Sequence, residues 1–241
     1  MWQTVITAAG NDDKVFQAAD FSGKKNWLDY NGETILENAI RSHSAATGKV
    51  RVVLRDSEAD EWNASKVVNE RNNLEPVFVD QDTSGALCTA LLGLRGLDLH
   101  APLVVAPGDS FVDMQDLELV RKMESLGADA ATLVFHSESP KYSYVRLAGS
   151  NRVSEIVEKR VISDLASTGF FYFRKASYLL QAAEWVLSKN LQTKGEFFMS
   201  SSLNYLIMSG MNVVALPIPE KSHYVRLATP QDLLREAKSS K

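Results

Sequence analysis

The fold is decided by the opening stretch, Thr4-Val5-Ile6-Thr7-Ala8-Ala9-Gly10-Asn11-Asp12-Asp13-Lys14. Residues 4–7 have the character of a buried strand, and that strand runs directly into two alanines and a glycine. Small residues there let backbone N–H groups approach a phosphate chain, whereas a side chain larger than methyl at Ala8, Ala9 or Gly10 would block the approach. Tight strand-to-helix turns also use small residues for packing alone, so the stretch by itself leaves both interpretations open.

Composition narrows the class of protein. The chain has 241 residues, 45% of them hydrophobic, which is enough for a sizeable α/β core. Its net charge of −4 argues against a nucleic-acid partner, which usually calls for a basic surplus. Without an apolar run near the roughly 20 residues of a membrane span, and without a signal-peptide pattern, we expect a cytoplasmic protein with no membrane partner. The single cysteine, Cys88, agrees with a reducing compartment, and the scattered histidines argue against zinc.

Strand-like and helix-like segments alternate over residues 1–135, which predicts an α/β fold with a Rossmann-like, mostly parallel sheet and helices on both faces. We expect strands at 4–7, 50–54, 76–79, 102–106 and 131–135, and helices at 33–43, 59–72, 84–94 and about 114–126. Residues 136–241 change rhythm and predict a mixed or antiparallel elaboration on the substrate side. Its expected strands are 142–148, 152–157, 169–173 and 212–217, with helices at 177–187, 197–208 and from 230. Because no linker or repeat interrupts the chain, we expect one domain over residues 1–241.

The most apolar strand stops at Pro107-Gly108-Asp109-Ser110. Ligands bind beyond the carboxyl ends of parallel strands, so Gly10 and Asp109 are placed to face one crevice. A carboxylate held by a tight turn at a strand end is well suited to Mg²⁺. The alternative is an N-cap for the next helix, although Asp113 or Asp116 would serve better. The Gly-Asp-Ser triplet also resembles a serine hydrolase motif, but the remainder of that hydrolase pattern is absent.

Three further groups of charged residues carry weaker signals. The first is Asp80-Gln81-Asp82, an Asp-x-Asp pattern that metal-dependent glycosyltransferases use, although such acids are more often solvated. Lys14, Lys24 and Lys25 lie near the first glycine turn and modestly favour an anion site in a net-acidic chain. Glu158-Lys159 ends a strand. The two residues either bind a polar ligand and its phosphate or form an ion pair at the surface.

Together these pieces match a family. Seven motifs stand in the order seen in the sugar-phosphate nucleotidylyltransferases: Ile6-Thr7-Ala8-Ala9-Gly10, Lys25 with Asn31-Gly32, Gly85-Ala86-Leu87-Cys88-Thr89, Gly108-Asp109, Glu158-Lys159, Gly169-Phe170-Phe171-Tyr172-Phe173 and Thr229-Pro230-Gln231-Asp232-Leu233. The chain resembles this family over nearly its whole length. Pro140-Lys141-Tyr142-Ser143-Tyr144 and Gly195-Glu196-Phe197-Phe198 are similar to the branch associated with capsule and surface-polysaccharide gene clusters.

The resemblance implies an enzyme that joins a nucleoside triphosphate to a phosphorylated small molecule, with Mg²⁺, and releases pyrophosphate. Residues 1–135 would form the nucleotide-binding half and residues 136–241 the substrate-binding half. It also implies a role for each site residue: Ala8, Ala9 and Gly10 contact the nucleotide, Gln81 and Gly85 read the base, Lys14 faces the triphosphate, Lys25 is the catalytic lysine, Asp109 binds Mg²⁺, and Glu158, Lys159 and Gly169 hold the second substrate. CTP is the first expectation for the nucleotide, ahead of UTP and dTTP.

This chemistry suits the residues at hand. At neutral pH a phosphate monoester is largely a dianion, so it needs no general base to attack. Catalysis then consists of aligning attacker and leaving group and neutralising the charge on the departing pyrophosphate. Lysines and one Mg²⁺ suffice for that.

The chain departs from the family pattern at five positions: Asp12 and Asp13 replace a glycine and a small residue, Lys14 replaces an arginine, Asn26 a proline, and Arg226 a late aspartate that many members use as a second metal ligand. These changes keep a second hypothesis open, a non-catalytic relative that binds a nucleotide or nucleotide-sugar. A third hypothesis is a glycosyltransferase that uses Asp80 and Asp82. The sequence leaves the acceptor and the oligomeric state open, a homo-oligomer included.

Overall fold

The computed structural model describes residues 2–43, 48–112 and 116–239. The strands of the main sheet are β1 (Gln3–Thr7), β4 (Lys49–Arg55), β5 (Leu74–Val79), β6 (Leu103–Pro107), β8 (Ala130–His136), β9 (Ser143–Leu147), β10 (Val153–Glu158), β11 (Leu165–Phe173) and β12 (Val213–Pro217). Four shorter strands are β2 (Asp29–Tyr30), β3 (Glu33–Thr34), β7 (Ser110–Val112) and β13 (Tyr224–Arg226). The helices are α1 (Asp13–Gln17), α2 (Ile35–His43), α3 (Ala59–Ala64), α4 (Lys66–Asn69), α5 (Ala86–Leu94), α6 (Asp116–Ser125), α7 (Ala176–Ser188), α8 (Met199–Met208) and α9 (Pro230–Ser239), with 3₁₀ turns η1 (Lys25–Trp27) and η2 (Asp56–Glu58).

The main sheet is parallel at one end and mixed at the other. Its strand order is β10-β9-β11-β6-β1-β4-β5, with β8 beside β11 and β12 beside β8. Pairing is parallel between β6, β1, β4 and β5, whereas β11 runs antiparallel to β6, β8 and β9. The predicted α/β fold with its antiparallel elaboration is confirmed. One detail differs, because β8 joins the sheet through antiparallel β11 and parallel β12.

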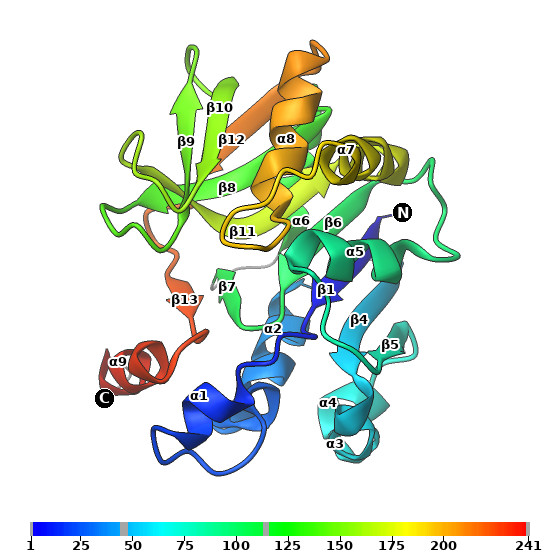
Figure 1. The fold of residues 1–241 in the computed structure, drawn as a ribbon, viewed down its shortest axis with the longest axis vertical. Helices are drawn as coiled ribbons and strands as arrows, with labels where there is room; N and C mark the ends of the chain where they lie inside the picture. Colours follow the sequence, from blue (N-terminus) through cyan, green and yellow to red (C-terminus); the bar gives the residue numbers. More distant parts are fainter. Residues whose placement is uncertain (1, 44–47, 113–115, 240–241) are drawn as a thin grey trace.

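Both faces of the sheet are covered, as the alternation along β1 demands. Val5 packs against the face that α5, α7 and α8 cover, and Ile6 against the face that α2, α3 and α4 cover. Figure 1 shows α5 in front of β1, with the β9–β10 pair and α8 at the opposite end from β4 and β5. Gly93 lets α5 cross β1 closely, because a Cβ there would lie 2.5 Å from Val5 Cγ1.

Two predicted helices differ in extent. The helix expected over 59–72 breaks into α3 and α4 at Ser65, whose extended backbone (ψ 127°) lets its side chain accept a hydrogen bond from Val68 N–H. The start of the helix expected near Met114 lies outside the described residues, and α6 begins at Asp116. No helix in the described part of the chain is long and apolar enough to cross a membrane.

A pair of three-residue strands links the C-terminal region to the end of β6. β7 begins directly after Asp109 and pairs antiparallel with β13, which sets Arg226 opposite Ser110. The N–H of Leu227 then donates to the carbonyl of Asp109 over 2.8 Å. The sequence did not indicate either strand, yet the pair brings a segment near the C-terminus to the carboxyl end of a central parallel strand.

Candidate active site

Two adjoining cavities lie beyond the carboxyl ends of β1 and β6. The larger, of about 470 Å³, is lined by the turn residues Ala8, Ala9 and Gly10 and by Lys25 and Asp109. The smaller measures about 280 Å³. The residues that line both are Thr7, Ala86, Pro107, Asp109 and Phe198. The predicted placement of Gly10 and Asp109 in one crevice is therefore what the structure shows, and Asp109 lies where the large cavity and the small cavity meet.

Backbone and small residues form the floor of the large cavity. The turns after β1 and β6 pack so closely that a Cβ on Gly108 would lie 2.7 Å from Ala8 Cβ. On the far side, Gly85 has a φ of +107°, and a Cβ there would lie 2.6 Å from the carbonyl oxygen of Phe197. Only glycine adopts such a backbone without strain. Because these glycines carry no side chain, the turns pack closely against their neighbours and the large cavity between them stays open for a ligand.

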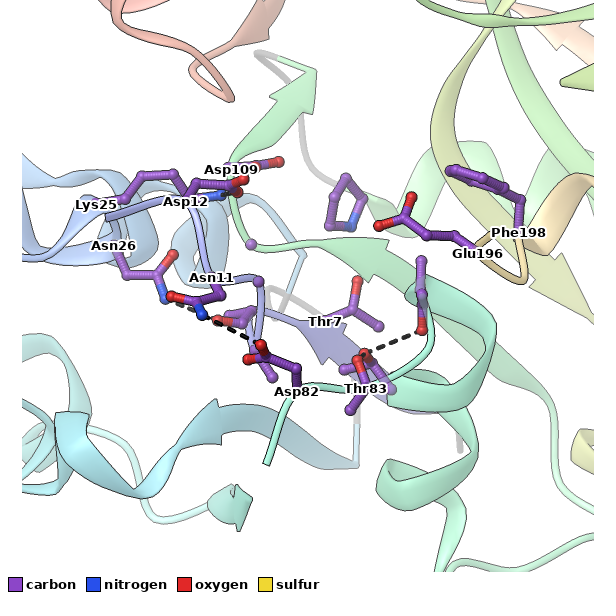
Figure 2. Close-up of a pocket in the computed structure, with 18 residues that line it drawn as sticks. Thr7, Asn11, Asp12, Lys25, Asn26, Asp82, Thr83, Asp109, Glu196 and Phe198 are labelled. Carbon is purple, nitrogen blue, oxygen red and sulfur yellow. Dashed lines mark hydrogen bonds and ion pairs between the residues drawn. The ribbon is translucent and has the colours of Figure 1, made fainter. Parts of the chain in front are cut away.

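Lys25 lies between two carboxylates. It is 5% exposed, and its Nζ lies 2.8 Å from Asp12 Oδ2 and 2.7 Å from Asp109 Oδ2. Its backbone N–H donates to Asp13 Oδ1 over 2.8 Å. Figure 2 shows Asp12, Lys25 and Asp109 together at one end of the large cavity, while Glu196 and Phe198 approach from the other. Asp12 and Asp13 thus position the lysine, a contact that the sequence did not reveal.

Burial and charge act in opposite directions on this cluster. Burial disfavours the Lys25 ammonium, but the charges of Asp109 and Asp12 outweigh it and hold the pKa of Lys25 above its usual range. Burial also opposes ionisation of Asp109, yet Lys25 and then Arg226 hold the pKa of Asp109 below its ordinary value of 3.8. At neutral pH Lys25 is therefore charged and Asp109 is ionised.

Asp109 and Asp12 are the carboxylates that would hold a magnesium ion, with the phosphates of a substrate completing its coordination shell. Such ions are commonly held by one or two carboxylates together with phosphate oxygens and water. Both carboxylates reach the same Lys25 Nζ, so their oxygens are near neighbours. No group of three or more metal-ligating side chains comes together in the described residues, so the protein alone offers an incomplete coordination shell.

Three residues that the resemblance implied, Lys14, Gln81 and Lys159, lie outside the lining of both cavities. Lys14, on α1, and Gln81, after β5, are exposed. The neighbour Asp82 lines the large cavity instead. Hydrogen bonds from Arg55 and Asn11, supported by the charges of Arg55 and Lys14, hold the pKa of Asp82 below its usual range. Since Asp82 has these protein partners and Asp80 is outside the lining, the Asp-x-Asp pattern does not form a paired metal site here.

Asn26 has a structural role that the sequence did not indicate. It is 3% exposed, and its Nδ2 donates to the Ala8 carbonyl and to Glu58 Oε1, each over 2.8 Å. The amide thereby ties η1 to the turn after β1. Nothing in the sequence marks an asparagine that follows a lysine as such a link.

The small cavity contains two of the three residues expected to hold the second substrate. Glu158 lines it and accepts hydrogen bonds from Ser143 Oγ and, over 2.9 Å, from Ser200 Oγ. Gly169 also lines it, at a φ of +88°. Lys159 does not, because its Nζ lies 4.3 Å from the ring centre of Phe198.

The small cavity also has lining residues for which the sequence assigned no role. These are chiefly Lys141, Tyr142, Tyr224 and Arg226. Lys141 and Tyr142 lie in a motif that the resemblance singled out, whereas the positions of Tyr224 and Arg226 depend on the β7–β13 pairing.

Known proteins share this arrangement of elements. A structure described as a nucleoside-diphosphate-sugar pyrophosphorylase from Vibrio cholerae RC9 has a TM-score of 0.80 at 20% identity, covering 98% of this chain and 99% of that one. A UDP-glucose pyrophosphorylase complexed with UDP-glucose has a TM-score of 0.79 at 13% identity, covering 100% of this chain and 98% of that one. At such identities the likeness concerns the fold.

Sequence comparison agrees. The chain is 26% identical over 181 residues to the bifunctional protein GlmU of Thermodesulfovibrio yellowstonii, a match that covers 68% of this chain and 37% of that protein. The chain therefore matches little more than a third of that relative's length. The model of the family described as nucleotidyl transferase matches residues 14–220. The chain belongs to the nucleotidyl transferase family, which supports the prediction of a nucleotidyltransferase enzyme.

Proposed function

We propose that the chain transfers a nucleotidyl group from a nucleoside triphosphate to a phosphorylated small molecule, a sugar phosphate being the first choice. The observation that carries the proposal is the position of Lys25 and Asp109, joined over 2.7 Å where the two cavities meet. An acceptor in the small cavity would then face the α-phosphorus of a triphosphate in the large cavity. An acceptor phosphate oxygen attacks that phosphorus, the bond to the bridging oxygen breaks, and pyrophosphate leaves with those electrons.

The nucleotide side of the mechanism depends on backbone and one lysine. Ala8, Ala9 and Gly10 leave room for the phosphate chain against their backbone, and Gly85 does the same at the opposite wall. Lys25, charged at neutral pH, neutralises phosphate oxygens as negative charge moves onto the leaving group. Mg²⁺, held by Asp109, would add charge neutralisation and orientation.

Lys14 and Gln81 would contact the nucleotide from outside the lining of the large cavity. Lys14 lies close enough to Asp82 for its charge to act on that carboxylate, and Asp82 lines the large cavity. We assign Lys14 a supporting charge at the outer phosphates and Gln81 a contact with the base. Both assignments are weaker than those of Lys25 and Asp109, because neither side chain lines the cavity.

On the acceptor side, Glu158 and Gly169 would contact the non-phosphate part of the molecule. A carboxylate already held by Ser143 and Ser200 is oriented to accept hydrogen bonds from hydroxyl groups. Lys159 would act indirectly, since it stacks on Phe198, which lines both cavities. We propose CTP as the nucleotide, ahead of UTP and dTTP, and a cytoplasmic role in capsule or surface-polysaccharide synthesis, on the motif resemblance alone.

The test is pyrophosphate release. The protein would be incubated with Mg²⁺, each of CTP, UTP, dTTP, ATP and GTP, and a panel of phosphorylated sugars, polyols and amines. We expect pyrophosphate with one nucleotide and only when a phosphorylated acceptor is present. No pyrophosphate from any pair would contradict the proposal.

A nucleotide-binding relative without catalysis is the second candidate, and the Asp12–Lys25 contact favours it. A carboxylate 2.8 Å from the lysine occupies part of the space that a triphosphate oxygen would need. Calorimetry separates the two candidates: nucleotide binding without turnover supports the second, and nucleotide binding with turnover supports the first.

A further inference from the structure

The small cavity carries a pair of cations beside Asp109. Lys141 and Arg226 are the lysine and arginine side chains that line it among the described residues. Both donate to Asp232, which lies behind them: Lys141 Nζ lies 2.9 Å from Asp232 Oδ1, and Arg226 Nη1 contacts Asp232 Oδ2. Asp232 is 4% exposed, whereas Lys141 is 34% and Arg226 19% exposed. The carboxylate is therefore buried and the cations face the space.

The fold positions this pair next to the proposed reaction centre. Arg226 lies opposite Ser110 in the β7–β13 pair, and the N–H of its neighbour Leu227 donates to the carbonyl of Asp109. Asp232 is held at the start of α9, where its N–H donates to Thr229 Oγ1 over 3.2 Å, an N-cap bond. Two segments far apart in the chain are thus joined at one carboxylate.

Within this group two cations share one carboxylate, Asp232. Asp109 and Glu158 also line the small cavity, so the positive charge is local to Lys141 and Arg226 and is not a surplus over the whole cavity. The ring of Tyr142 restricts both, with its centre 5.2 Å from Lys141 Nζ and 5.7 Å from the Arg226 guanidinium carbon. An arginine bound to protein through Nη1 keeps other N–H donors, and its planar fork suits two phosphate oxygens at once. A phosphate monoester carries between one and two negative charges at neutral pH.

We propose that Lys141 and Arg226, positioned by Asp232, form the subsite that binds the phosphate of the acceptor. This inference depends on the proposed function and names the anchor of its second substrate. It assigns to these residues a role that the resemblance gave to Lys159, which stacks on Phe198 outside the cavity lining. A phosphate held by Arg226 lies beside Asp109, and therefore next to the cavity where the triphosphate would bind.

The test uses inorganic phosphate as the probe, with EDTA present and isothermal titration calorimetry as the readout. Arg226→Gln should raise the Kd for phosphate about tenfold or more, because a charge-assisted, two-point contact is lost. Lys141→Gln should raise it about threefold or more. Arg235→Gln is the matched control: Arg235 also lies near Asp232, at 3.6 Å, but outside the cavity lining, and the Kd should change less than about twofold.

Three comparisons make the result decisive. Lys159→Gln and Lys25→Gln remove the competing cations. The proposal would be overturned if either of these variants raised the Kd for phosphate while Arg226→Gln left it unchanged. Absence of phosphate binding by the wild type would do so too. Arg226→Lys keeps a charge next to Asp232 and should fold even if Arg226→Gln does not, with a smaller but measurable loss of phosphate affinity.

Pyrophosphate release separates this inference from the proposed function. Should the predicted phosphate pattern appear without turnover from any nucleotide, the anion subsite stands and the proposed reaction fails. Should turnover occur with an acceptor KM that Arg226→Gln leaves unchanged, the reaction stands and this subsite is wrong. Under the proposal, the acceptor KM rises about tenfold while the nucleotide KM changes little.

Discussion

The two cavities that meet at Asp109 are built in opposite ways. In the large cavity, one buried cation, Lys25, faces two carboxylates, Asp12 and Asp109. In the small cavity, two cations, Lys141 and Arg226, share one carboxylate, Asp232. Under the proposed function, the net negative charge of the first group means that a triphosphate binds well only with a divalent cation. The cation pair of the small cavity, which Asp109 and Glu158 also line, would bind a phosphate without one. Under the proposed function, this difference predicts that the metal binds together with the nucleotide.

Lys25→Ala should have the largest effect, because among the described residues that line the large cavity Lys25 is the one with a positive charge. We expect kcat/KM to fall about 10³-fold, the scale for losing one preorganised charge at the reacting phosphate. The matched control is Lys24→Ala: Lys24 is 30% exposed and pairs with Glu61, and it should leave kcat/KM within about threefold. Equal, small effects of both variants would show that Lys25 does not act on the substrate.

Asp109→Asn should lower kcat about 10²-fold and raise the Mg²⁺ concentration needed for half-maximal activity. The side chain keeps its size but loses the charge that would hold the metal. In metal-free phosphate titrations the same variant should bind phosphate at least as well as the wild type, because an anion next to Arg226 is removed. An unchanged magnesium dependence would show that Asp109 does not hold the metal, and the proposed difference between the cavities would then be wrong.

Gly85→Ala should destabilise the wall of the large cavity by about 2 kcal/mol or more, measured by chemical denaturation. The added Cβ would meet the Phe197 carbonyl oxygen at 2.6 Å, at a φ of +107°. Gly32→Ala is the control, since Gly32 also has a positive φ (+87°) but has nothing within 4 Å of the added Cβ, and should cost about 1 kcal/mol. Similar losses in both would mean that backbone strain alone, and not the close approach of Phe197, requires the glycine.

Asp12→Asn should have the smallest effect, a gain of about two- to fivefold in nucleotide affinity in the absence of Mg²⁺. Asp12 is 46% exposed beside Lys25, so its charge opposes a triphosphate only through solvent-screened repulsion. The gain should shrink when Mg²⁺ is added. Weaker nucleotide binding by Asp12→Asn in the presence of Mg²⁺ would show that Asp12 holds the metal together with Asp109. Weaker binding in the absence of Mg²⁺ would contradict the prediction.

The same contrast separates what the sequence could predict from what it could not. The large cavity is made by short turns directly after strands, so the small residues Ala8 to Gly10 and the Pro-Gly turn before Asp109 already predict its place. The direction in which a single side chain points was harder to predict. Lys14 and Gln81 lie within the right segments, but the turns point Asp12 and Asp82 toward the cavity instead.

The small cavity could not be predicted in the same way, because its residues come from segments that meet only through tertiary contacts. Arg226 reaches Asp109 through two three-residue strands, too short to carry an alternating pattern. Lys141 and Arg226 share Asp232, which lies 91 residues beyond Lys141. Lys159, by contrast, was expected from its motif, yet a left-handed backbone (φ +54°) places its ammonium over Phe198.

The central claim, that an acceptor phosphate in the small cavity attacks a nucleotide in the large one, is tested most directly by an oxygen-18 label. The acceptor that supports pyrophosphate release would carry oxygen-18 in its phosphate, and the product would be examined by ³¹P NMR. We predict that the oxygen bridging the two phosphorus atoms of the product is oxygen-18 and that pyrophosphate contains none. An unlabelled bridge would show that the acceptor phosphate is not the attacking group, and would contradict the account.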